Sequence, residues 1–300
     1  MDNIYLIIDE SGAKGYSDNI ENTLGEFGIM VGYLIPESWI DKVKSELDSI
    51  KQKYKTDRKV HITDLLQSEQ EQMRVEIFNY FKTRKIFFVY EAIYSQGYYS
   101  YHESLKELYT KNKQQIKPSM KWSSNKEKLL LHSDLFLGVF MKALSFCKDI
   151  QKMEEVKLHI KSDVIDDSIK KKFEKNVDKN LNIGIKSTKI VKGFDTKKKE
   201  VVQYKTSFEI TEGLEIFEKF SNVEYEITCE DSSLTLAADV LVNSLYRALN
   251  NSEFKLKCLP LNTYEAVEDF PLNKLIYGLY PHNEKLYIVD KIYSHPNNKD

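Results

Sequence analysis

The sequence predicts an α/β protein in which helices cover a mixed β-sheet. Continuous apolar runs at 4–8 and 27–35 indicate buried strands, and alternating apolar and polar residues at 155–162 indicate a half-buried strand. Apolar residues at helical spacing indicate helices, most clearly from 232 to 249. Because strands and helices follow one another along 300 residues, we expect one elaborated domain rather than two small ones.

The first part of the chain predicts a hairpin, two helices and a third strand. A short polar loop joins 4–8 to 27–35, so these strands are expected to pair antiparallel. A proline opens the amphipathic stretch 36–54, and proline is tolerated in the first turn of a helix. A second helix is expected at 68–82, followed by an aromatic and β-branched strand at 85–93.

The second part predicts a helical insertion, several strands and a late helix. The insertion is placed at 98–148, within a domain spanning 1–250. It holds a tyrosine-rich stretch at 98–109 and an apolar helix at 127–148, and we expect both to be helices that cover the sheet. Alternating or β-branched residues predict further strands at 155–162, 183–191, 201–210 and 223–228. Residues 251–300 hold only short apolar runs, so we expect a C-terminal extension packed on the same domain.

Composition limits the class of protein more than it identifies it. The 44 basic and 46 acidic residues nearly cancel, so contacts with phosphates must come from local patches such as Lys197–Lys199. The widely spaced Cys147, Cys229 and Cys258 suit neither a disulfide framework nor a tetrahedral zinc site. The apolar run before Asp9 is too short for a signal peptide or membrane span, so we expect a cytoplasmic protein without a membrane partner.

Four acidic residues lie where a metal site could form. Asp9 and Glu10 follow the first strand, Asp163 follows a later strand, and Asp239 flanks the apolar stripe of the late helix. Two-metal hydrolysis of phosphodiesters needs carboxylates from separate elements to converge on ions roughly 3.5 to 4 Å apart. We therefore predict Asp9, Asp163 and Asp239 as catalytic ligands of Mg²⁺ or Mn²⁺. Glu10 is a further catalytic candidate, although its side chain should point to the opposite face from Asp9.

Structural roles compete with these assignments. Asp9 could serve as a turn residue, and Asp163 could cap a following helix. A carboxylate beside a buried stripe, as at Asp239, is costly unless it is paired or bound to a metal. Asn243 and Arg247 follow Asp239 at four and eight residues, so they could support a ligand and contact a phosphate, while a solvated surface role is the alternative for Arg247.

Several segments together resemble the uncharacterised DUF3800 family. They are IYLIIDESG with its glycine-containing hairpin, KVHITDL, the strand that ends at Asp163, and SSLTLAADVLVNSLYRAL. The resemblance covers about residues 4–250 and is specific at its two ends. It implies a ribonuclease-H-like sheet, with Asp9 and Asp239 as metal ligands, and occurrence in bacterial mobile-element or antiviral settings. A nuclease acting on DNA or RNA is the function that this resemblance favours.

One departure from the family pattern keeps alternatives open. The family commonly has a glutamate just before its histidine-containing segment, whereas this chain has Lys59 two positions before His61. Asp57, His61 or Asp64 would then complete the site, with His61 matching the family position, or Lys59 would contact a phosphate. A catalytically inactive ribonuclease-H-like binding or sensor subunit of a defence system is the second hypothesis. Beside a nucleic acid, the partners that we consider are a second copy of the chain, in a homodimer, and a partner protein of the defence system.

Two further hypotheses concern the same first acid. Phosphoryl transfer through Asp9 as a nucleophile wants a second acid two residues later, where this chain has Ser11. A PIN-like nuclease also begins with an acid at the end of a strand, and it would differ in topology more than in chemistry.

Overall fold

The main sheet of the molecule has five strands in the order β3-β2-β1-β5-β8. The computed structural model describes residues 2–13, 25–54, 60–116, 119–122, 131–181, 187–208, 220–251 and 260–279. The sheet strands are β1 (Asp2–Gly12), β2 (Phe27–Pro36), β3 (Phe88–Tyr94), β5 (Glu155–Ser162) and β8 (Asn222–Cys229). β2 is antiparallel to β1 and β3, whereas β5 runs parallel to both β1 and β8. The predicted α/β class with a mixed sheet is therefore confirmed.

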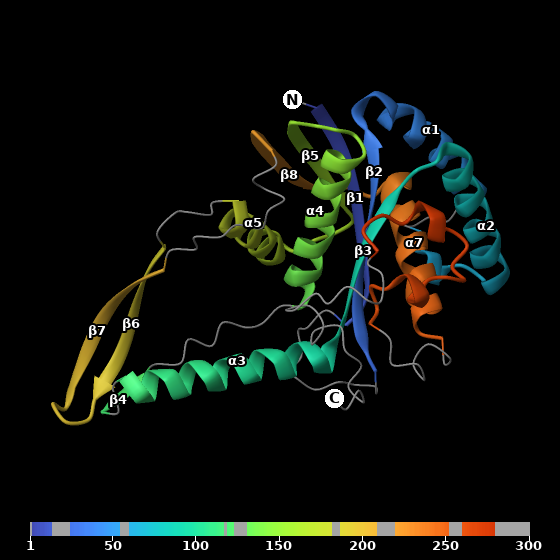
Figure 1. The fold of residues 1–300 in the computed structure, drawn as a ribbon. Coiled ribbons are helices and arrows are strands. Elements are labelled where there is room, and N and C mark those ends of the chain that lie inside the picture. Colours follow the sequence, from blue (N-terminus) through green and yellow to red (C-terminus); the bar gives the residue numbers. More distant parts are fainter. Residues whose placement is uncertain are drawn as a thin grey trace.

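Helices cover both faces of this sheet, which makes three layers (Figure 1). One face carries α1 (Ile40–Lys51), α2 (Gln67–Arg84) and α7 (Ser233–Leu249). The other carries α4 (Leu131–Asp149) and α5 (Asp167–Leu181). Short 3-10 turns lie at Glu37–Trp39, Gln52–Tyr54, Ile62–Asp64, Tyr264–Ala266 and Asn273–Leu275.

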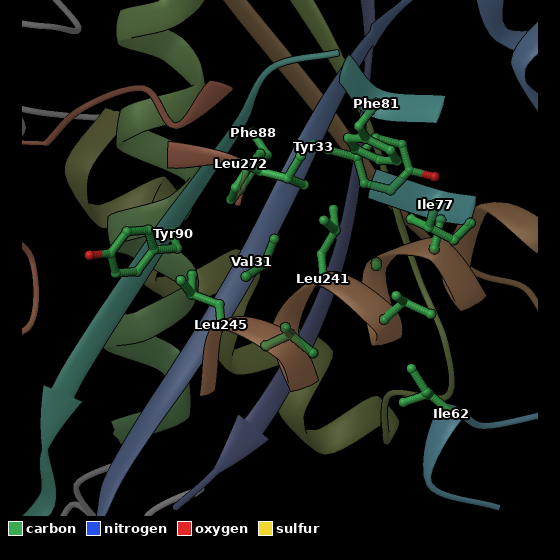
Figure 2. Packing of buried hydrophobic residues seen from close by; sticks show 14 of the residues in the cluster. Val31, Tyr33, Ile62, Ile77, Phe81, Phe88, Tyr90, Leu241, Leu245 and Leu272 are labelled. Atoms are coloured by element: carbon green, nitrogen blue, oxygen red, sulfur yellow. The ribbon is translucent and has the colours of Figure 1, made fainter. Parts of the chain in front are cut away.

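Alternation along β1 divides its side chains between the two layers. Ile7 belongs to the apolar cluster under α7, and Leu6 and Ile8 belong to the cluster under α4. Figure 2 shows the first cluster, with Leu241 and Leu245 of α7 among the side chains of the sheet. Since successive side chains of a strand point to opposite faces, the residues after Ile8 continue this division.

The start of α7 is fixed by local hydrogen bonds and by one buried contact with the sheet. The side chain of Ser232 accepts a hydrogen bond from the backbone amide of Thr235, and the Ser232 amide donates to the Thr235 hydroxyl. The buried Tyr33 hydroxyl of β2 donates to the Leu234 carbonyl at 2.8 Å. A cap of this kind stabilises a helix by about 1 kcal/mol. The contact with Tyr33 holds the first turn of α7 against β2.

The region from 98 to 148, expected as a helical insertion, contains two helices with different surroundings. α4 packs on the sheet and supplies much of the second apolar cluster. α3 (Ser95–Ile116) instead extends away from the sheet, and β4 (Met120–Trp122) follows it. β4 pairs with β6 (Ser187–Asp195), which pairs with β7 (Glu200–Phe208). The strands expected at 183–191 and 201–210 therefore belong to a separate three-stranded sheet.

The chain returns to the core after α7. Leu261 accepts a hydrogen bond from the Tyr90 hydroxyl at 2.7 Å, and Ile276 forms a parallel bridge with Phe88. Residues 260–279 therefore pack on the same body as the sheet, whereas the rest of the expected extension to 300 lies outside the described residues. Within the described ranges, no helix combines the length and apolarity needed to cross a membrane.

Candidate acidic site

Asp9 and Asp163 meet at one edge of the main sheet. β1 and β5 run parallel, and their register pairs Ile8 with Ser162. Asp9 and Asp163 each come one residue later on these neighbouring strands, which are about 4.8 Å apart in a sheet. Asp9 lies on the same face as Ile7, the face covered by α7, and its side chain is half-buried. The two acids predicted from strand ends are thus brought together.

Asp239 reaches the same place from α7. Its Oδ2 accepts a hydrogen bond of 2.8 Å from the backbone amide of Ile62. His61 precedes Ile62 in the chain, and its ring lies between two carboxylates. The His61 Nδ1 is 3.6 Å from Asp239 Oδ2, and the His61 Nε2 is 3.9 Å from Asp163 Oδ2. Three separate elements and the loop before α2 therefore contribute to one group, which we call the acidic site: Asp9, Asp163, Asp239 and His61.

The electrostatics show that negative charge accumulates in the acidic site. Burial raises the pKa of the Asp9 carboxyl well above its usual value, and the charges of Glu10 and Asp239 raise this pKa further. Burial also raises the pKa of Asp239, against the opposing effects of the Ile62 amide and His61. Carboxylates that repel one another in a partly desolvated place favour either a proton or a cation between them.

Glu10 lies on the other face of the sheet. Its Oε2 is 3.7 Å from Nε2 of His132, a buried residue of α4. The alternation of β1 explains this position, since Glu10 continues the face of Leu6 and Ile8. Although Glu10 is predicted as a catalytic residue, its side chain does not join the acidic site. Beside the effect of burial, the charge of Glu10 raises the pKa of Asp9, and a hydrogen bond from the Glu10 backbone lowers it.

Asn243 and Arg247 continue from Asp239 along α7 toward α2. The Asn243 Oδ1 accepts a hydrogen bond of 2.8 Å from the Arg74 guanidinium. Arg247 Nη1 is 3.4 Å from Glu71 Oε1, and the same carboxylate oxygen is 2.6 Å from Arg74 Nη1. The two predicted auxiliary residues therefore belong to a polar contact between α7 and α2.

Arg74 is the residue of this region that sequence reasoning missed. Its guanidinium is buried, and the positive charge acts on Asp239 from beside the acidic site. Burial and the charge of Arg247 lower the pKa of Arg74, while Glu71 opposes this effect. The one signal in the sequence that could have identified Arg74 is that an arginine occupies an otherwise apolar position of the helix. Lys59, the other predicted auxiliary residue, lies outside the described residues.

The chemistry of the acidic site suits a hard divalent cation. Mg²⁺ and Mn²⁺ prefer carboxylate oxygens, and Mn²⁺ also accepts imidazole nitrogen. Asp9, Asp163, Asp239 and His61 supply these donors, and burial together with the neighbouring carboxylates raises the pKa of Asp9 and Asp239. Across the described part of the chain, no three such side chains have their donor atoms grouped as metal ligands. The His61 ring lies between Asp163 and Asp239, so an ion would have to share this space with it or displace it.

Comparison of the chain with protein-family models, with curated proteins and with solved structures finds no match. The acidic site itself is therefore the feature of the molecule that indicates a function.

Proposed function

We propose that the protein is a divalent-metal-dependent nuclease with a ribonuclease-H-like fold, and that it belongs to the DUF3800 family. The observation that carries the proposal is the convergence of Asp9, Asp163 and Asp239 from β1, the end of β5 and α7. The strand order β3-β2-β1-β5-β8, with β2 antiparallel to its neighbours and β1, β5 and β8 parallel to one another, is compatible with this fold. An antiviral or mobile-element role is the biological setting that we propose with it.

The residues of the acidic site would act mainly by position and charge. Divalent cations, when bound, supply the Lewis acidity that phosphodiester hydrolysis requires. Asp9, Asp163 and Asp239 would hold them, and the Ile62 amide fixes the orientation of the Asp239 carboxylate. His61 is partly exposed and lies near two of the acids, so its ring can take or deliver a proton beside them.

Hydrolysis needs little covalent chemistry from the chain. The oxygen of a water molecule becomes bonded to phosphorus, one ester P–O bond breaks, and the leaving oxygen takes up a proton. Arg74 adds positive charge beside the carboxylates, and the exposed Arg247 can contact a neighbouring phosphate. The acidic site would thus hold the cations, and Arg74 and Arg247 would supply positive charge for the anionic backbone.

The proposal is tested by cleavage of labelled single-stranded and duplex DNA and RNA with Mg²⁺ or Mn²⁺. We expect cleavage that EDTA stops and that Asp163→Asn and Asp239→Asn each lower by a factor of at least about 100, because one ligand is neutralised. Asp269→Asn, at an exposed acid of the 260–279 segment, is the matched control and should retain full activity. Cleavage that survives both EDTA and the two substitutions would refute the mechanism.

The position of His61 favours one second candidate. Its ring already pairs with Asp163 and Asp239, so the site could be held closed without metal in an inactive binding or sensor subunit. Titration calorimetry with Mn²⁺ separates the two functions. A nuclease should take up the ion in a manner that depends on Asp9, whereas the inactive subunit should show no such uptake and no cleavage.

A further inference from the structure

A separate part of the molecule carries most of its excess positive charge. We call it the basic arm and define it as α3, β4, β6 and β7 with the turn at 196–199. In Figure 1 α3 runs away from the main sheet, and the three-stranded sheet lies near its far end. α3 has 22 residues, which corresponds to about 33 Å at 1.5 Å per residue. The basic arm therefore presents a long surface outside the body of the protein.

Charge is distributed unevenly between the basic arm and the rest of the chain. The arm contains ten lysines and four acidic residues, a formal charge of +6, in a chain whose total is −2. The remainder therefore carries −8. The near-neutral composition hides this separation, and a basic surface on an acidic protein is the electrostatic feature expected of a polyanion-binding element.

The turn between β6 and β7 holds three lysines in a fixed conformation. Asp195 accepts hydrogen bonds from the backbone amides of Lys197 and Lys198 at 2.9 and 3.2 Å. These bonds lower the pKa of Asp195, so its charge serves to close the turn. Lys199 has a φ of 56°, and all three lysine side chains are exposed. The positive charges are thus presented together at the end of the hairpin.

An exposed aromatic residue lies beside these lysines. Phe194 of β6 has 41% of its surface exposed and pairs with Val201 of β7, which is 68% exposed. Lys192 is exposed on the same strand. Lysines near an exposed aromatic ring are typical of surfaces that track a nucleic-acid backbone and stack on its bases. This combination favours a nucleic acid over an acidic peptide.

The basic arm leaves the sheet at the edge that holds the acidic site. The sheet register places Phe27 opposite Tyr94, the last residue of β3, and Gly28 opposite Gly12, the last residue of β1. α3 begins directly after Tyr94, and therefore at the edge to which the carboxyl ends of β1 and β5 point. A nucleic acid lying along the arm would be led to this edge.

We infer that the basic arm binds the phosphate backbone of a nucleic acid and so guides the substrate toward the acidic site. The inference deepens the proposed function and rests on it, but binding and cleavage can be measured separately. Lysine contacts with phosphates release counterions, so binding should be independent of sequence and should weaken steeply with salt.

The test combines Lys192→Glu, Lys197→Glu and Lys198→Glu in one variant, which leaves the left-handed Lys199 unchanged. The control variant makes the same charge change at Lys170–Lys172 on α5, outside the basic arm. Binding of short fluorescein-labelled DNA and RNA, single-stranded and duplex, is followed by anisotropy in EDTA over a salt series. Circular dichroism verifies that both variants are folded.

We expect the arm variant to bind at least about tenfold more weakly than the control variant, with the slope of log K against log salt reduced by roughly 2 to 3. Equal affinity of the two variants would overturn the inference, as would failure of the unchanged protein to bind any of the four probes. If the arm variant differs from the control variant only in its oligomeric state, measured by sedimentation velocity, the arm is an interface between two copies of the chain. That result would also overturn the inference. Asp9-dependent cleavage that persists with normal affinity in the arm variant would leave the proposed function intact.

Discussion

Replacing Asp9 by Asn should make the metal-free protein more stable while removing its response to divalent cations. Asp9 is half-buried within β1, just beyond the part that pairs with β5, and both burial and the charges of Glu10 and Asp239 raise its pKa. Asparagine has nearly the same shape and no charge. The substitution therefore removes the repulsion and keeps the packing, at the expense of a metal ligand.

The direction of the stability change that we expect for Asp9→Asn follows from the direction of the pKa shift of Asp9. A carboxyl whose pKa is raised on folding contributes fully to stability when the pH is below its pKa in the unfolded state. This contribution is lost as the pH rises through its pKa in the folded state. At neutral pH, which lies above the ordinary pKa of an aspartate, Asp9 therefore destabilises the fold. Leaving a buried polar group uncompensated costs about 1 to 3 kcal/mol, so Asp9→Asn should raise the Tm by roughly 2 to 10 °C.

Differential scanning calorimetry in EDTA and in Mn²⁺ measures both effects. In EDTA the Asp9→Asn protein should melt above the unchanged protein, by less at pH 4 than at pH 7. Mn²⁺ should raise the Tm of the unchanged protein and of the Asp269→Asn control, but not that of Asp9→Asn. A lower Tm for Asp9→Asn in EDTA, or an equal response of its Tm to Mn²⁺, would refute the reasoning.

Two further predictions concern buried cations. Arg74→Met should lower the free energy of unfolding by about 2 to 4 kcal/mol in denaturant titrations, because the polar groups that its guanidinium contacts are left unpaired, and Arg74→Lys should recover less than half of the loss. An unchanged stability would contradict a structural role for that contact. Lys142→Met should cost about 3 to 5 kcal/mol by the same measurement, because the buried Glu91 carboxylate, 2.9 Å from the Lys142 ammonium, loses its counter-charge. Adding Glu91→Gln should restore part of the stability, and a double variant no more stable than the single one would disprove the pairing argument.

The packing of the basic arm and of α4 could not be predicted from the sequence. Both lie in regions of helical or alternating pattern, and these patterns predict that an element forms without predicting what it packs against. The region 98–148 therefore was expected as one insertion, although α4 covers the sheet and α3 leaves it. The lysines at 197–199 were visible as a charge run, but their place on an extended arm depends on the pairing of β6 with β4.

The sequence alone determined the hairpin of β1 and β2, the strand β5, the helix α7 and the candidate acids Asp9, Asp163 and Asp239, because each follows from residue patterns within one element. Only the tertiary structure decided that His61 lies between two of these acids and that Arg74 is buried beside Asp239. It also located the partner of Glu10, the residue His132 on α4. Side-chain periodicity is a property of a few neighbouring residues, whereas the partner of a charged group depends on the packing of elements far apart in the chain.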